Sequence, residues 1–343
     1  MIRRAVGRAW KRAEDLGMTV VVLLPGYEYA GRWDAFERHV REVVREANAH
    51  KVEIQYDIWN EPDHENFWKG SRDEFFEWWV RSFRLLRRLD PEKPITGPSV
   101  TSLQWSPGWT EAFLVYARNH DTLPDILGWH SMSGKGQKIE PDVKSMQGFL
   151  ARNGIKINRF ETNEIIGKKD KTRPGTAVAF FSAIERAGIV CAGKAIWGGE
   201  PEAPQRLLNH LLTPDREPRS VWWAYRRYAD VTGKLVTVKK GKATDAVAGY
   251  DLSTERIRVL VGRFGEERAD VEVRLRNLAA LWPEPPAREC IVRIERIPHT
   301  DEQKLSPPLP AEEVPVEPQD NMASVVIPNL GPDDATFLVV ERH

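Results

Sequence analysis

The chain of 343 residues is long enough for a barrel of about 250 residues and a smaller second domain. Its 50 basic and 50 acidic side chains cancel, so it lacks the positive excess that holds a phosphate backbone, and we expect no nucleic acid partner. A hydrophobic share of 41% and a charged share of 29% exclude a disordered or fibrous protein.

Six short apolar runs alternate with helical patterns from the N-terminus to about residue 230. One helical pattern spans Trp33 to Asn48 and another spans Arg72 to Leu89, each with its apolar residues on one face. Strands that alternate with helices are typical of a parallel sheet. The candidate strands are Thr19–Leu24, Val52–Asn60, Pro94–Ser99, Asp125–His130, Ile155–Asn163 and Val190–Trp197.

The pattern changes after Gly233, where strands with period-two alternation follow one another without helical periodicity. We therefore predict two domains, a barrel over residues 1–232 and an antiparallel β-sandwich over residues 233–343. The proline-rich stretch from Pro307 to Pro318 is interpreted as a surface loop, because strand patterns resume after it.

The chain begins Met1-Ile-Arg-Arg and continues into a basic amphipathic segment without the apolar stretch of a signal peptide. No window reaches the length of a membrane span, so we expect a soluble chain without a membrane partner, whose location is open. The two cysteines, Cys191 and Cys290, match neither a metal-ligand spacing nor a disulfide framework.

A carboxylate stands at the end of the second candidate strand, in the sequence Asn60-Glu61-Pro62. The C-terminal ends of barrel strands form the active face, which favours a catalytic carboxylate over a loop or helix-capping residue. The fifth candidate strand supplies two more carboxylates, Glu161 and Glu164. Glycosidic hydrolysis needs two carboxyl groups, one protonated and one ionised, so these positions predict a glycosidase.

The spacing of these motifs resembles the clan A glycoside hydrolases, and within the clan it is most similar to family 39 and its relatives. In that clan the acid/base follows Asn at the end of strand four, and the nucleophile ends strand seven. Taking Val52–Asn60 as strand four makes Ile155–Asn163 strand seven. Three further segments look like the same group, namely Gly128-Trp-His130, Ala195-Ile-Trp197 and the stretch from Ser220 to Asp230.

The resemblance implies a role for each matched residue in a retaining (β/α)8 enzyme without a cofactor or metal. Glu61 would be the acid/base and Glu164 the nucleophile, while Asn60 would bind the 2-hydroxyl of the sugar. His130 would line the site and Trp197 would form the floor of the sugar subsite, although both residue types are also common in structural positions at strand ends.

The nucleophile assignment has an alternative, because Glu161 and Glu164 lie three residues apart. We prefer Glu164 because Asn163-Glu164 resembles the strand-seven region of family 39 relatives, although Ile165 stands where those relatives have an aromatic residue. A full barrel would also have two strands and a helix before the segment Arg3–Leu16, and we expect a barrel that lacks them.

Three other functions stay open at this point. The chain could be an inactive carbohydrate-binding relative, an interaction scaffold, or a metal-dependent hydrolase that uses His64, His130, Asp57 and Glu61. The metal reading is weak, because no two histidines have ligand spacing. The sequence does not identify the sugar, the linkage, internal or terminal cleavage, or the oligomeric state.

Overall fold

The computed structural model describes residues 10–24, 27–195, 209–282, 289–307 and 312–342. The chain divides into two compact units, and each is described by itself below. The first consists of Met1–Ser131, Pro141–Glu164 and Ile189–Gly193, and the second of Met132–Glu140, Ile165–Gly188 and Lys194–His343. Among the described residues, no helix is both long and apolar enough to cross a membrane.

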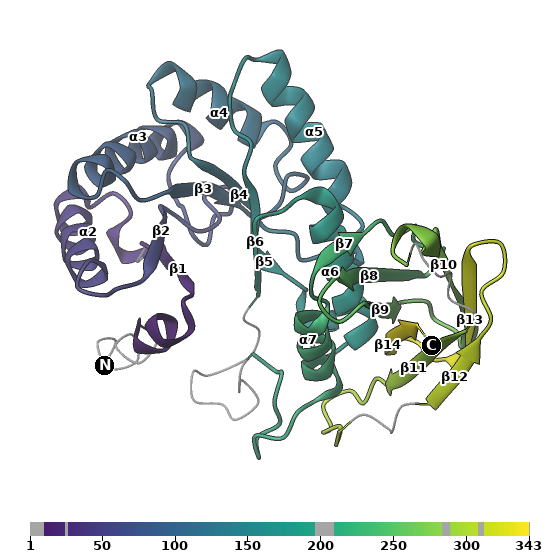
Figure 1. Cartoon of the computed structure of the whole chain (residues 1–343). Coiled ribbons are helices and arrows are strands. Elements are labelled where there is room, and N and C mark those ends of the chain that lie inside the picture. Colours follow the sequence, from purple (N-terminus) through teal and green to yellow (C-terminus); the bar gives the residue numbers. More distant parts are fainter. Residues whose placement is uncertain (1–9, 25–26, 196–208, 283–288, 308–311, 343) are drawn as a thin grey trace. The chain divides into compact units, whose positions relative to one another are not determined.

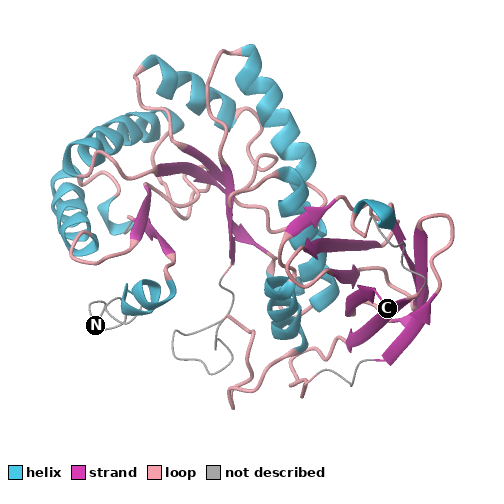
Figure 2. Ribbon diagram, in the orientation of Figure 1, coloured by secondary structure: helices cyan, strands magenta, loops and turns pink. Residues whose placement is uncertain are grey.

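A six-stranded sheet organises the first unit, with its strands in chain order from β1 to β6. Neighbouring strands from β1 to β5 pair in parallel. The sheet curls, with helices on its outer side, as in part of a (β/α)8 barrel (Figures 1 and 2). The strands are β1 Thr19–Leu23, β2 Glu53–Asp57, β3 Ile95–Val100, β4 Ile126–Trp129, β5 Phe160–Ile165 and β6 Cys191–Lys194. The helices are α2 Trp33–Ala47, α3 Arg72–Leu89, α4 Trp109–Asn119 and α5 Ile139–Arg152.

The outer helices form where the apolar periodicity predicted them. Helix α3 has the expected bounds, because Ser71 begins it with a capping box in which the side chain of Glu74 accepts a hydrogen bond from the backbone of Ser71. Helix α2 turns Phe36, Val40, Val44 and Ala47 inward. Both helices bury one apolar face, so the layer of helices covers the outer side of the sheet. The polar residues of a site can then lie at the ends of the strands.

The prediction of a barrel that lacks its first strands is confirmed as a partial barrel. Within the described residues, the strand order ends at β1 on one side and at β6 on the other, without a pairing between them. Several strands are shorter than predicted, among them β2 and β5. Strand β2 stops at Asp57, because the following residues turn towards the site, and β5 begins only at Phe160, which pairs with Leu127.

The second unit holds helices α6 (Pro174–Ala187) and α7 (Ser220–Asp230) and two antiparallel sheets. One sheet has the order β12-β11-β14-β9-β8-β7 and the other pairs β10 with β13. Apolar side chains from both sheets form one core, which includes Val259, Val292 and Val325. The strands are β7 Lys234–Val236, β8 Thr244–Asp251, β9 Arg256–Arg263, β10 Ala269–Arg276, β11 Cys290–Ile297, β12 Glu312–Val316, β13 Met322–Leu330 and β14 Ala335–Arg342.

Antiparallel strands thus occur where the period-two patterns lie, after Gly233. The description of this region as a β-sandwich stays a prediction, as does the domain boundary between residues 232 and 233. The proline-rich stretch also contributes a strand, because β12 includes Pro315 at the edge of its sheet. An edge strand tolerates proline, since the missing N–H can face away from the ladder.

Candidate active site

Glu61 lies four residues beyond the end of β2, on a backbone turn at the ends of the strands. Its φ is 44°, in the left-handed region, and its N–H donates a hydrogen bond of 2.9 Å to the carbonyl of Ser99 at the end of β3. A non-glycine residue in this conformation costs about 1–3 kcal/mol, and such residues cluster at functional sites. The side chain is 9% exposed, so its position is well defined by packing.

His130 connects the two predicted catalytic glutamates. Its Nδ1 lies 2.9 Å from Oε1 of Glu61 and 3.9 Å from Oε2 of Glu164. The ring is fully buried, and the N–H of His130 donates to the carbonyl of Val100. The residue therefore follows β4 directly into the site, where its ring hydrogen-bonds to Glu61 and lies close to Glu164.

Glu164 lies near the end of β5, with a side chain that is 35% exposed. Burial raises its pKa, the charge of Glu61 raises it further, and His130 acts in the opposite direction. The carbonyl of Glu164 accepts a hydrogen bond of 2.9 Å from the N–H of Ser131. The ends of β4 and β5 are therefore held side by side at the site.

Glu161 lies in a different environment, fully buried among residues of the sheet. Its two carboxylate oxygens accept hydrogen bonds of 2.6 Å from Gln55 and 2.7 Å from Thr96. Burial raises the pKa of Glu161, and these two donors act against that rise. The structure thus brings Glu164, rather than Glu161, against His130, which in turn contacts Glu61.

Asn60 is buried beside Glu61 and interacts with the phenol of Tyr27, a residue that sequence reasoning missed. Burial and the charge of Glu61 raise the pKa of the Tyr27 phenol, and the charge of Glu164 adds to this. Tyr27 follows β1, so its position after a barrel strand was the available signal. The predicted subsite residue Trp197 lies outside the described residues.

A buried polar network supports the site from below. Asp57 accepts hydrogen bonds of 2.8 Å from Ser99 and 2.7 Å from Asn163, the neighbour of Glu164. Burial and the charge of Glu161 raise the pKa of Asp57 well above its usual range. Because Asp57 and Ser99 belong to neighbouring strands, this network fixes the backbone that carries the two glutamates.

The residues of the metal alternative do not form a ligand set. Nδ1 of His64 accepts a hydrogen bond from the N–H of Asn66, and Asp57 has the partners given above. In the described part of the chain, no group of three or more His, Cys, Asp or Glu residues has the geometry to hold a metal ion.

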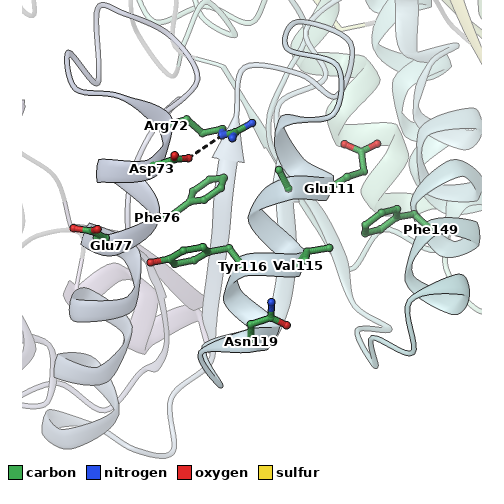
Figure 3. A pocket seen from close by; sticks show the side chains of 10 residues that line it. Arg72, Asp73, Phe76, Glu77, Glu111, Val115, Tyr116, Asn119 and Phe149 are labelled. Carbon is green, nitrogen blue, oxygen red and sulfur yellow. Dashed lines mark hydrogen bonds and ion pairs between the residues drawn. The ribbon is translucent and has the colours of Figure 1, made fainter.

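Two hollows open on the first unit. One of about 540 Å³ is formed by the segment after Glu61, with the lining residues Pro62–Asn66, Trp68–Gly70, Arg72 and Trp109. The other, of about 630 Å³, lies among helices α3, α4 and α5 (Figure 3). Phe76, Tyr116 and Phe149 line that second hollow. Neither candidate catalytic glutamate lines either hollow, so neither volume by itself marks the site.

Comparisons with known proteins show what the chain as a whole is similar to. The family profile described as "Glycosyl hydrolases family 39" matches residues 32–162. A 3-O-beta-L-arabinopyranosyl-alpha-L-arabinofuranosidase from Bifidobacterium pseudocatenulatum is 23% identical over 70% of this chain. The chain spans only 27% of that enzyme's length.

Solved structures share the fold. N2152 from Neocallimastix frontalis has a TM-score of 0.84 at 22% identity, and the match covers 98% of this chain and 84% of that one. A GH39 beta-xylosidase from Caulobacter crescentus has a TM-score of 0.63 at 16% identity, over 93% of this chain and 73% of that one. Together with the profile match, these similarities relate the chain to glycoside hydrolase family 39.

Proposed function

We propose that the chain is a retaining glycoside hydrolase, with Glu61 as acid/base and Glu164 as nucleophile. The observation that carries this proposal is that both carboxylates lie within 3.9 Å of Nδ1 of His130. Since the two oxygens lie 2.9 and 3.9 Å from that atom, they are at most about 6.8 Å apart. Retaining enzymes separate their carboxyl groups by about 5–5.5 Å, and inverting enzymes by about 6.5–9.5 Å. The bound includes the retaining separation and lies below most of the inverting range.

The proposed reaction has two displacements. The ionised carboxylate of Glu164 attacks the anomeric carbon while Glu61 gives its proton to the departing oxygen, which leaves a glycosyl ester on Glu164 and an alcohol. Glu61, now ionised, takes a proton from water as the water attacks the anomeric carbon and releases Glu164. Asn60 would hold the 2-hydroxyl of the sugar, in line with its position between Tyr27 and Glu61.

The neighbours of the two glutamates suit this division of work. Oε1 of Glu61 lies 2.9 Å from Nδ1 of His130, so a proton can be held between these two atoms. Oε2 of Glu164 lies 3.9 Å from the same nitrogen, which is too far for a hydrogen bond. Glu164 is also the more exposed of the two, which gives a substrate access to its oxygens. Glu161 has both oxygens bound by buried donors and is poorly placed to attack.

The substrate would be a poly- or oligosaccharide. The names of relatives include an arabinofuranosidase and a beta-xylosidase, so arabinosides and xylosides come first in a panel of aryl glycosides that also holds glucosides and uronides. Release of the phenol by the wild type but not by Glu164→Gln supports the proposal. An inactive carbohydrate-binding relative would bind these sugars and release no phenol from any of them.

The region from residue 233 to 343 is proposed as a β-sandwich domain that supplies no catalytic group, and residues 1–232 as the catalytic domain. A variant in which both Glu61 and Glu164 are replaced should therefore have no turnover. Residual hydrolysis in a Glu61→Ala and Glu164→Ala double variant would place the catalytic groups elsewhere.

A further inference from the structure

Four aromatic rings follow one another from the candidate site across the adjoining loops. The ring of Tyr27 lies 4.9 Å from that of Phe67, which lies 5.6 Å from His64. His64 in turn stacks on Trp105 at 5.6 Å, with an angle of 17° between the ring planes. These four residues are called the ring row below.

The ring row is accessible along its length. Tyr27 is 45% exposed and Trp105 is 59% exposed, although one face of the indole lies on His64. Phe67 and His64 are partly exposed. An exposed tryptophan is costly to leave in water, and here packing does not account for it, because the ring lies outside the core.

The inner end of the row lies at the candidate catalytic groups. The ring of Tyr27 lies 6.4 Å from that of Trp59, which directly precedes Asn60 and Glu61. The phenol of Tyr27 interacts with Asn60 and with the charges of Glu61 and Glu164. The N–H of His64 donates a hydrogen bond of 3.0 Å to the carbonyl of Glu61. The row therefore starts beside the proposed acid/base and leads away from it.

Hydrogen bonds hold the two loops of the row together. Asp63 accepts hydrogen bonds of 2.8 and 3.1 Å from the N–H and the hydroxyl of Thr101, which precedes the loop of Trp105. The N–H of Trp105 donates to the hydroxyl of Ser102 at 3.0 Å. These contacts place the stacked His64 and Trp105 on a prepared surface, which lowers the entropy lost when a ligand binds there.

We propose that the ring row binds the leaving-group part of a neutral oligosaccharide, with Trp105 as an outer stacking platform. This inference rests on the proposed function, because it takes Glu61 as the acid that protonates the leaving oxygen. The sugars beyond that oxygen must lie on the side of the acid, where the row begins. The flat apolar faces of sugar rings stack on aromatic rings, and the polar hollow next to the row offers Asp63, Asn66 and Lys69 for their hydroxyls.

The inference separates two kinds of substrate. A nitrophenyl glycoside has a leaving group of one ring, which reaches only the inner end of the row. An oligosaccharide extends to Trp105. Trp105→Ala should therefore lower kcat/KM for an oligosaccharide about tenfold and leave kcat/KM for the nitrophenyl glycoside within about twofold. Trp105→Phe should restore most of the loss because it keeps an aromatic face.

Binding tests the row without relying on turnover. The full chain carrying Glu164→Gln is titrated by calorimetry with xylohexaose, linear arabinohexaose and cellohexaose, and again with Trp105→Ala added. We expect at least one sugar to bind, with a Kd about tenfold weaker after the tryptophan is removed. Leu252→Ala, at a residue that is 77% exposed in the second unit, is the control and should leave the Kd unchanged.

The outcomes distinguish this inference from the proposed function. Binding that depends on Trp105 supports the row even if no aryl glycoside is hydrolysed, in which case only the glycosidase proposal fails. If aryl glycosides are hydrolysed but Trp105→Ala changes neither Kd nor kcat/KM, the proposed role of the ring row is refuted and the proposed function stands. If none of the three hexasaccharides binds, the row is also overturned.

Discussion

Replacement of Glu161 by Gln separates the two candidate nucleophiles. Burial raises the pKa of Glu161, which favours its neutral acid, and a glutamine side chain has the same pattern of one acceptor oxygen and one donor group. The new carbonyl oxygen can accept from Gln55, while the new amide can donate to the hydroxyl of Thr96, which already donates to the carbonyl of Ile126. Gln55 and Thr96 then keep their partners, and one N–H of the new amide has none.

The structure gives the magnitudes. Glu161→Gln should lower the free energy of unfolding by no more than about 3 kcal/mol, because it exchanges hydrogen bonds of similar geometry and buries one N–H without a partner. Glu161→Ala should cost about 2–5 kcal/mol, because it opens a cavity and leaves Gln55 without its acceptor. Glu164→Gln should be as stable as the wild type, since that side chain is partly exposed, and should lose activity by a factor of about 1,000 or more.

Urea unfolding and kcat on the best aryl glycoside measure both effects. The pH dependence provides a further check with a fixed sign. A carboxyl whose pKa is raised in the folded state binds its proton more tightly than in the unfolded chain, so its contribution to stability is complete below about pH 4.3 and declines above it. Glu161→Gln removes this decline, so its stability relative to the wild type should rise from pH 4 to pH 7. If well-folded Glu161→Gln lost activity as completely as Glu164→Gln, the choice of Glu164 would be refuted.

Three more predictions concern the site. Glu61→Ala should still be glycosylated by substrates with an activated phenol, and azide should restore its turnover with retained configuration. With Glu164→Ala, azide should instead give the inverted glycosyl azide. NMR of the products measures both outcomes, and the reverse pattern would exchange the two roles. The acid limb of kcat/KM should lie above the usual glutamate pKa of about 4.3, because burial raises the pKa of Glu164 and only its ionised form attacks. His130→Gln should move this limb to higher pH, since His130 lowers the pKa of Glu164. A limb that stays in place or moves to lower pH contradicts this. Tyr27→Phe should raise KM about two- to tenfold by removing the partner of Asn60, and an unchanged KM would exclude that contact from substrate binding.

Local patterns in the sequence determined the elements of the first unit. The apolar periodicity predicted α3, because a helix is specified by contacts within a few residues along the chain. The position of Glu61 after a buried strand and before Pro62 placed a carboxylate at the active face for the same reason. The order of six strands in a partial barrel followed from their alternation with helices.

Only the tertiary structure decided how these strand ends meet. Glu161 and Glu164 are three residues apart, and the sequence could not tell which of them approaches Glu61, because that depends on the register of β5 against β4 and on where the strand begins. The pairing of Glu61 with His130 joins residues 69 positions apart, and Tyr27 reaches Asn60 from the short 3-10 helix that follows β1. Such contacts are set by sheet pairing and packing across the fold, which no local pattern encodes.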